Sequence, residues 1–155
     1  MTEFVKLTGK ASWAKVFEDD RDMKGFEDAF VDCNGAYTIN MDLDDVSMER
    51  FKDSGSKLVG RKDGTILVKR KHSVFNKKTG EEIEAFSGPP QVVDAEGNDW
   101  DPEKKIGNGS IVEVALTVTP SKEKSSIVFT RLEGVKVLEW VEFGSENEDG
   151  QKELP

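Results

Sequence analysis

Residues 69–78 hold five lysine and arginine side chains, one histidine and one phenylalanine within ten positions. In a β-strand alternate side chains point to the same face, so Lys69 and Lys71 share one face while Arg70 and His72 share the other. Cationic side chains neutralise phosphates, and aromatic rings stack on nucleobases of any sequence. The stretch therefore predicts a surface for a single strand of nucleic acid. Its candidate residues are Lys69, Arg70, Lys71, His72, Phe75, Lys77 and Lys78.

The same pattern has a second interpretation, because lysines on an edge strand keep that edge from pairing with other chains. Other segments carry residue types that would extend a nucleic-acid surface. Trp13 lies between Lys10 and Lys15, and a turn between two predicted strands holds two more lysines. Hairpin loops at a barrel mouth contact ligands in oligonucleotide-binding folds. These additional candidates are Lys10, Trp13, Lys15, Tyr37, Lys122 and Lys124.

Charge is unevenly distributed along the chain, whose formal net charge is −9. Residues 18–53 hold twelve acidic and four basic side chains, whereas residues 61–78 hold seven basic and one acidic. This segregation matters more for binding a polyanion than the total charge does. Residues 144–155 contain four acids, one base and no aromatic or β-branched residue, which predicts a disordered acidic tail.

Cys33 and His72 are the only residues of their types in the sequence. One cysteine cannot form an internal disulfide, which fits a reducing compartment. A closed zinc site needs four Cys or His ligands, and any hydrolytic triad would depend on the one imidazole. The aspartates near residue 44 lack the glycine and distal glutamate of a calcium loop and are interpreted as helix caps. We therefore expect no metal, no cofactor and no enzymatic activity.

The elements that would position these side chains are short β-strands separated by turn residues. A helix is predicted over residues 45–54, with Asp44 or Asp45 as N-cap and Gly55 at the C-terminal cap. Gly134 is expected to mark a bulge or bend, so that one long strand serves both halves of a small barrel. No apolar run is long enough for a signal peptide or a membrane span. The predicted strands cover residues 11–17, 36–41, 65–74, 82–86, 91–94, 110–119, 126–131 and 135–143.

The order of several segments resembles one protein family. Near the start stand GKASWAK at residues 9–15 and GAY at residues 35–37, and NKKTG at residues 76–80 follows the basic stretch. Further on come PPQVVD, IGNGS, a run ending at Thr119-Pro120, and LEGV leading to Phe143-Gly144 and the acidic tail. In this order the chain resembles the single-stranded DNA-binding proteins of short-tailed, T-seven-like bacteriophages, including those of cyanophages.

The resemblance implies an OB-fold, a five-stranded Greek-key barrel with one short α-helix, over residues 1–143, followed by the tail at residues 144–155. It implies sequence-independent binding of single-stranded DNA in phage replication, recombination and repair, in the cytoplasm of the infected host. It also implies that the tail contacts the phage DNA polymerase and helicase-primase and competes with DNA, and it allows a homodimer. Because charges are screened over about 8 Å in physiological salt, an acidic protein can bind DNA through one basic groove.

Two positions depart from the family pattern. An aromatic residue often follows the proline of the fourth long strand in this family, whereas Ser121 stands here. The family tail is typically longer and ends in an aromatic residue, whereas this chain ends in Glu153-Leu154-Pro155. The rival interpretation is an acidic protein-interaction or DNA-mimic module, against which the basic block at residues 61–78 argues. Which sheet face would carry DNA stays open, because a shift of one residue in strand register exchanges the two faces.

Overall fold

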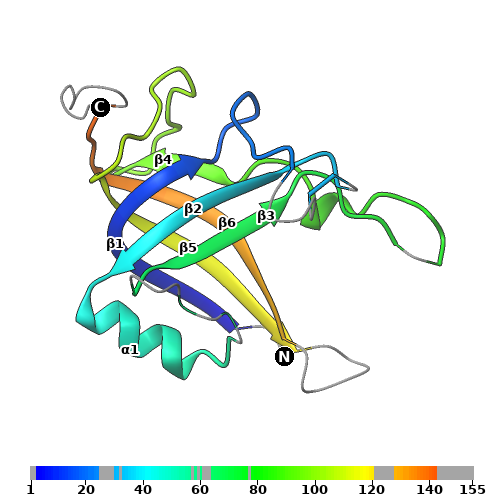
Figure 1. Cartoon of the computed structure of the whole chain (residues 1–155), viewed down its shortest axis with the longest axis horizontal. Coiled ribbons are helices and arrows are strands. Elements are labelled where there is room, and N and C mark those ends of the chain that lie inside the picture. Colours follow the sequence, from blue (N-terminus) through cyan, green and yellow to red (C-terminus); the bar gives the residue numbers. More distant parts are fainter. Residues whose placement is uncertain are drawn as a thin grey trace.

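Six β-strands and one α-helix form the described part of the computed structural model, which covers residues 3–24, 30–31, 33–56, 58, 60, 64–76, 78–120 and 128–142 (Figure 1). In chain order these elements are β1 (Glu3–Lys15), β2 (Ala36–Leu43), α1 (Asp45–Asp53), β3 (Ile66–Lys71), the 3₁₀ turn η2 (Glu84–Phe86), β4 (Gln91–Asp94), β5 (Ile111–Pro120) and β6 (Val128–Glu139). Within those ranges no helix is long and apolar enough to cross a membrane.

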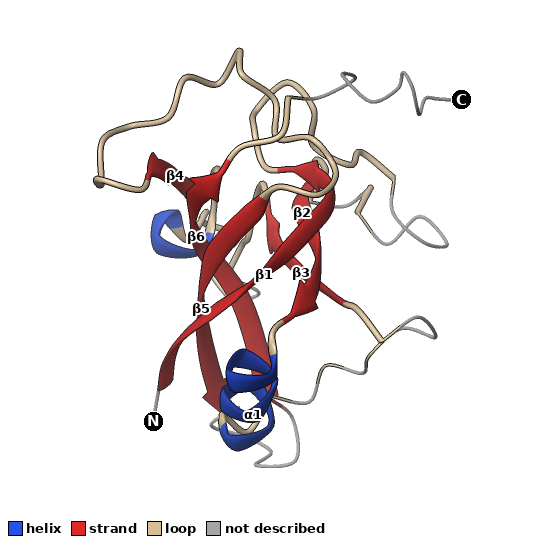
Figure 2. Ribbon diagram, turned by 90° about the vertical axis from the view of Figure 1, so that its left-hand side faces the viewer, coloured by secondary structure: helices blue, strands red, loops and turns tan. Residues whose placement is uncertain are grey.

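The strands form one sheet in the order β3-β2-β1-β5-β6-β4. Neighbours are antiparallel except β4 and β6, which run parallel. This mainly β architecture with one short helix agrees with the prediction, although β4 adds a sixth strand and no hydrogen-bonded ladder between β3 and β6 is found among the described residues. The two strands still lie side by side, so the sheet curls into an open barrel (Figure 2).

The inner face of the curled sheet carries the hydrophobic core. On β5, buried Val112, Val114 and Leu116 alternate with more exposed residues, the period of two typical of a strand with one solvent-facing side. The alternation also determines which side chains of each strand point outward. The buried residues of the other strands that belong to the same core are Leu7, Ala11, Ile39, Met41, Ile66, Val68, Leu132, Val135 and Val137.

Helix α1 lies at one end of the sheet and matches the predicted span to within one residue (Figure 1). Asp44 is the N-cap, and its Oδ1 accepts a hydrogen bond of 2.8 Å from the backbone N–H of Ser47. Ser47 in turn accepts a 2.7 Å hydrogen bond from the backbone N–H of Thr8, which joins the helix to β1. Gly55 follows the helix with a φ of 85°, a backbone conformation that glycine adopts without strain.

Residues 82–86 were predicted as a strand, but they form a single bridge and the turn η2. The reason is Ser87, whose hydroxyl accepts a 2.9 Å hydrogen bond from Val74 N–H and donates one of 2.9 Å to the carbonyl of Ile83. These bonds satisfy backbone groups that a longer ladder would otherwise pair.

The predicted runs 126–131 and 135–143 join into the one strand β6, which contains a bulge. Ala115 pairs with Gly134 while Leu116 pairs with Leu132, so Glu133 has no opposite residue on β5. Gly134 also lets β4 approach, because a Cβ at this position would lie 3.2 Å from the carbonyl oxygen of Gln91. The expected bulge at Gly134 is thereby confirmed, and the second half of β6 pairs with both β5 and β4.

Candidate nucleic-acid interface

Exposed lysines from β1 and β3 lie on the outer face of the sheet. Lys15 on β1 and Lys69 on β3 both pair with Thr38 of the intervening strand β2. Directly paired residues share a face, and the residues flanking Thr38 point into the core, so both lysines point outward. Lys71 and Lys10 lie on the same face by the same register. We call Lys10, Lys15, Lys69 and Lys71 the basic face.

Trp13 lies beside this face in an irregular part of β1. The register between β1 and β2 shifts between Ser12 and Lys15, and Trp13 has a φ of 51° there. Its backbone N–H donates a 2.8 Å hydrogen bond to Oδ1 of Asn108, and its side chain is 68% exposed. The indole is therefore presented to solvent, where a base could stack on it.

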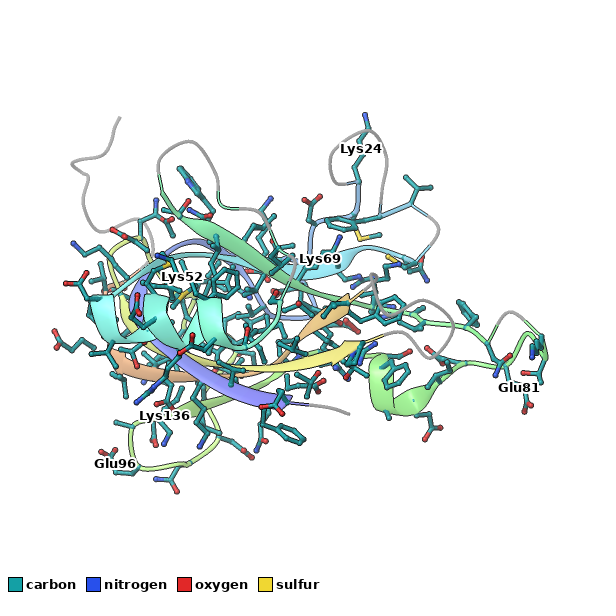
Figure 3. The ribbon with its side chains drawn as sticks, turned by 90° about the horizontal axis from the view of Figure 1, so that it is seen from below. Lys24, Lys52, Lys69, Glu81, Glu96 and Lys136 are labelled. Atoms are coloured by element: carbon teal, nitrogen blue, oxygen red, sulfur yellow. The ribbon has the colours of Figure 1, made fainter. Side chains whose placement is uncertain are left out.

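Lys69 is held in a partly desolvated position at the centre of β3 (Figure 3). Its Nζ lies 5.2 Å from the centroid of the Phe30 ring, within cation–π range. Desolvation lowers the pKa of Lys69, and the like charge of Lys71 lowers it further. A phosphate placed between the two ammonium groups would relieve both effects.

A groove of about 350 Å³ separates β3 from the start of β6. It joins a larger, mainly apolar hollow of about 630 Å³, with which it shares Val74, Phe129 and Arg131. We call the smaller cavity the β3–β6 groove, and it is also lined by Leu58, Lys69, Arg70, Lys71, Val128 and Thr130. We call the larger cavity the phenylalanine hollow, and it is also lined by Phe4, Ile83, Ala85, Phe86, Thr117, Thr119, Pro120 and Glu133.

Two rings at these cavities are open to solvent. Phe4 on β1 is 80% exposed and pairs with Thr117 of β5, while Phe129 on β6 is 53% exposed and pairs with Thr119. Arg131, two residues beyond Phe129, places its guanidinium carbon 3.8 Å from the centroid of the Phe86 ring. The surface thus combines cations with exposed rings, the two groups that a single strand of nucleic acid requires.

Arg70 points the opposite way from Lys69 and Lys71, and its side chain is inside the barrel with 7% of the residue exposed. Its guanidinium donates to the carbonyls of Ala85, Ser87 and Gly88, at 2.9–3.0 Å, and to Oε1 of Glu133 at 3.1 Å. These partners occupy its donors, so Arg70 is not available to a phosphate in this conformation.

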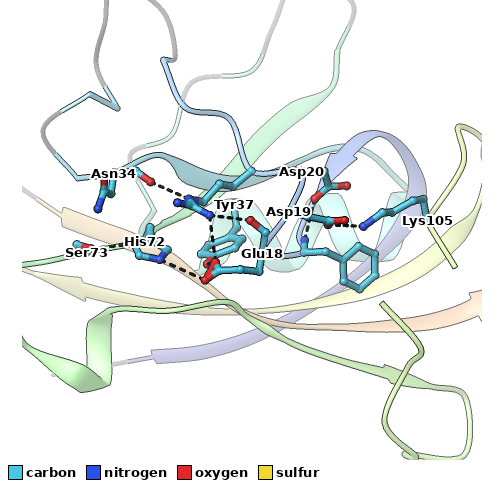
Figure 4. Close-up of polar contacts among 10 residues, drawn as sticks. Glu18, Asp19, Asp20, Asn34, Tyr37, His72, Ser73 and Lys105 are labelled. Atoms are coloured by element: carbon cyan, nitrogen blue, oxygen red, sulfur yellow. Dashed lines mark hydrogen bonds and ion pairs between the residues drawn. The ribbon is translucent and has the colours of Figure 1, made fainter. Parts of the chain in front are cut away.

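Tyr37 and His72 both contact the carboxylate of Glu18 (Figure 4). Tyr37 has no exposed surface, and its hydroxyl donates a 2.7 Å hydrogen bond to Oε2 of Glu18. Nε2 of His72 lies 3.4 Å from Oε1 of the same carboxylate, and Nη1 of Arg21 lies 3.2 Å from Oε2. The Tyr37 hydrogen bond is the largest cause that lowers the pKa of Glu18. The buried Tyr37 ring cannot stack on a base.

Phe75 and Lys78 lie on the segment between β3 and η2. Phe75 is 52% exposed and forms a bridge with Glu82, and Lys78 is exposed with its N–H bonded to Oδ1 of Asn76. Figure 3 shows this segment extending away from Lys69 to Glu81. The predicted residues Lys77, Lys122 and Lys124, together with Ser121 and residues 143–155, lie outside the described residues.

Sequence reasoning missed Phe4, Phe129 and Arg131 as surface residues. Phe129 and Arg131 are two residues apart, a spacing that places them on one face of a strand. That signal was present, but an aromatic residue in a strand is more often part of the core.

No protein-family model matches the sequence, and no curated protein matches it. The structure is similar to the crystal structure of gp2.5, a single-stranded DNA-binding protein encoded by bacteriophage T7, with a TM-score of 0.62. That similarity covers 100% of this chain and 96% of that chain at 20% sequence identity. A single-stranded DNA-binding protein from bacteriophage Enc34, truncated at its C-terminus, matches with a TM-score of 0.48 and 15% identity over 90% of this chain and 87% of that chain. The similarity to gp2.5 confirms the predicted fold class and the predicted resemblance.

Proposed function

We propose that this protein binds single-stranded DNA without sequence preference, along the basic face and into the β3–β6 groove. The observation that carries the proposal is the row formed by Lys15, Thr38 and Lys69 across three strands, continuous through Lys71 with a groove that exposes Phe129. The fold shared with gp2.5 of bacteriophage T7, itself a single-stranded DNA-binding protein, supports the same assignment.

Phosphates are the partners proposed for Lys15, Lys69, Lys71 and Arg131. The net charge of −9 does not oppose this, because charges farther away than about 8 Å are largely screened in physiological salt. The bases are proposed to stack on Phe129 and Trp13 and to reach Phe4 in the phenylalanine hollow. Stacking of this kind contributes about 1–3 kcal/mol per base and tolerates every base.

The biological setting proposed from the family resemblance is phage DNA replication, recombination and repair in the cytoplasm of the host. Residues 1–143 are the proposed DNA-binding domain, and the acidic residues 144–155 are proposed to contact a DNA polymerase or a helicase-primase and to compete with DNA. A full-length variant with the acids at 146, 148, 149 and 153 changed to amides tests this. It should bind single strands more tightly than the wild type and lose capture of the polymerase. Unchanged affinity and capture would contradict the role of the tail.

The direct test of the proposed function is a fluorescence-anisotropy titration of a labelled single-stranded oligonucleotide, with unlabelled duplex as competitor, at two salt concentrations. We expect binding that weakens as salt rises and that duplex does not displace. Displacement by duplex at equal concentration would contradict single-strand specificity. Absence of binding at low salt would overturn the proposal and favour the protein-interaction or DNA-mimic alternative.

A further inference from the structure

Arg70 of β3 and Glu133 of β6 connect the two strands that face each other at the opening of the barrel. β3 and β6 lie side by side without a ladder among the described residues, and the 3.1 Å ion pair between Arg70 and Glu133 spans the boundary between them. The other oxygen of Glu133, Oε2, accepts a 2.8 Å hydrogen bond from the hydroxyl of Thr117 on β5. We call this arrangement of Arg70, Glu133 and Thr117 the Arg70–Glu133 bridge.

The bulge in β6 explains why Glu133 can reach Arg70. Glu133 is the residue of β6 without an opposite residue on β5, because the register shifts between Ala115 and Leu116. A bulge redirects the side chain of its extra residue, and here that side chain contacts Arg70 of β3 while staying partly exposed to solvent. The strand irregularity and the ion pair are therefore parts of one arrangement.

The bridge also determines where the ring of Phe86 lies. Arg70 donates to the carbonyls of Ala85, Ser87 and Gly88, which surround Phe86 on both sides. Three hydrogen bonds from one planar guanidinium hold this short segment to β3, and a fourth joins the guanidinium to Glu133 on β6. The Phe86 ring is thereby held at the wall of the phenylalanine hollow.

Phe86 in turn orients Arg131. The guanidinium carbon of Arg131 lies 3.8 Å from the ring centroid, so the ring supports one face of the guanidinium. Desolvation, chiefly, lowers the pKa of Arg131, which is consistent with a cation held close to apolar groups at the groove. A series of contacts thus runs from Glu133 through Arg70 and Phe86 to Arg131.

We propose that Arg70 and Glu133 are positioning residues for DNA binding, which fix Phe86 and so aim Arg131 at a phosphate in the β3–β6 groove. This inference rests on the proposed function, because it assigns the orientation of a cation in the same site. It assigns a role to Glu133 that its charge alone would not suggest.

Because Glu133 is negatively charged, the direction in which Glu133→Gln changes the affinity for DNA tests the inference. A carboxylate that only lines the phenylalanine hollow, beside the groove, repels phosphates, so Glu133→Gln would strengthen DNA binding. A carboxylate that holds Arg70 supports binding, so the same substitution would weaken it. Glu139→Gln is the matched control, because Glu139 is an exposed acid on the same strand and undergoes the same change of charge.

The experiment is an anisotropy titration of labelled oligodeoxythymidylate with the full-length wild type, Glu133→Gln, Glu139→Gln, Arg131→Ala and the double variant Glu133→Gln/Arg131→Ala. We expect Glu133→Gln to weaken binding about three- to tenfold, the equivalent of one ordinary hydrogen bond, and Glu139→Gln to leave it unchanged or slightly tighter. Because Glu133 acts through Arg131, it should have no further effect once Arg131 is absent.

Unchanged or tighter binding by Glu133→Gln in a wild type that binds DNA would overturn the positioning role and leave the proposed function intact. An equal loss in the presence and absence of Arg131 would overturn it as well. If Glu133→Gln fails to fold, Phe86→Leu replaces it, because this change removes the ring under Arg131 and leaves the bridge in place. Phe86→Leu should then weaken the wild type but not Arg131→Ala, and equal effects would overturn the proposal. A wild type that does not bind at low salt would overturn both proposals.

Discussion

Lys15 on β1 and Lys69 on β3 pair with the same residue of β2, Thr38, so three neighbouring strands align two lysines on the outer face of the sheet. Lys71 continues this row toward the β3–β6 groove, where Phe129 and Arg131 come from β6. The arrangement depends on strand register, because a shift of one residue in β3 would exchange Lys69 with Arg70. The proposed function rests on this register.

The first prediction concerns pH. Desolvation and Lys71 lower the pKa of Lys69 in the free protein, and a bound phosphate would raise it again, so binding takes up protons. The affinity should therefore fall as pH rises through the lowered pKa. The measurement is the dissociation constant for oligodeoxycytidylate, whose bases do not titrate here, from about pH 7 to about pH 10 at constant ionic strength. Lys69→Arg, which stays protonated, should show a smaller fall, and an equal fall in both proteins would contradict the prediction.

A second prediction concerns stacking in the β3–β6 groove. Phe129→Leu keeps an apolar side chain of similar burial but removes the ring, and it should weaken single-strand binding by about 1–3 kcal/mol. The salt dependence should not change, because no phosphate contact is lost. Val46→Ala, an exposed apolar residue on α1, is the control and should bind as the wild type does. Full affinity in Phe129→Leu would show that its ring contacts no base.

A third prediction concerns stability in acid. The Tyr37 hydrogen bond lowers the pKa of Glu18 in the folded protein, so this carboxylate stabilises the fold above its unfolded-state pKa. That contribution is lost as pH falls through the lowered pKa. Tyr37→Phe keeps the buried ring and should cost about 1 kcal/mol at neutral pH, less at pH values below about 4. Urea denaturation at both pH values checks this; a deficit that stays constant with pH would contradict it. Arg21 and His72 still contact the carboxylate in both proteins.

A fourth prediction concerns the cap of α1. Asp44→Ala removes the acceptor for the backbone N–H of Ser47 and should lower the free energy of unfolding by about 1 kcal/mol. Glu49→Ala, an exposed change within the same helix, should alter it by much less. The urea midpoints of the two variants give the comparison, and equal midpoints would show that the cap does not stabilise the fold.

Much of the fold was predictable because its signals are local. The helix cap at Asp44 or Asp45 and strand β4 were predicted from residue type and spacing, and turn residues bounded β2, β4 and β5 to within two positions. The predicted run 11–17 was wrong at its start, because β1 begins at Glu3. Residues 82–86 were mispredicted because the side chain of Ser87, not a partner strand, satisfies the nearby backbone. The bond to Val74 spans thirteen residues, so a local sequence pattern does not reveal it.

The candidate site was predictable only in part, for the same reason. The stretch around Lys69 indicated a basic strand, but the face on which each base lies depends on pairing with β2. This pairing turns Arg70 inward, where acceptors from Ala85 to Glu133 surround its guanidinium. No local pattern in the sequence indicates those acceptors. Phe129 looks like a core residue in the sequence, because only the position of β6 at the edge of the groove exposes its ring.

The most direct test of the basic face compares the salt dependence of single-strand binding between the wild type and the triple variant Lys15→Ala/Lys69→Ala/Lys71→Ala. Each phosphate contact contributes about 0.7 to the slope of log K against log salt for single strands, so the variant should lose about 2 from the slope. Lys52→Ala, on α1, is the control and should keep the wild-type slope (Figure 3). A triple variant with the wild-type slope and affinity would contradict the assignment of this face to DNA.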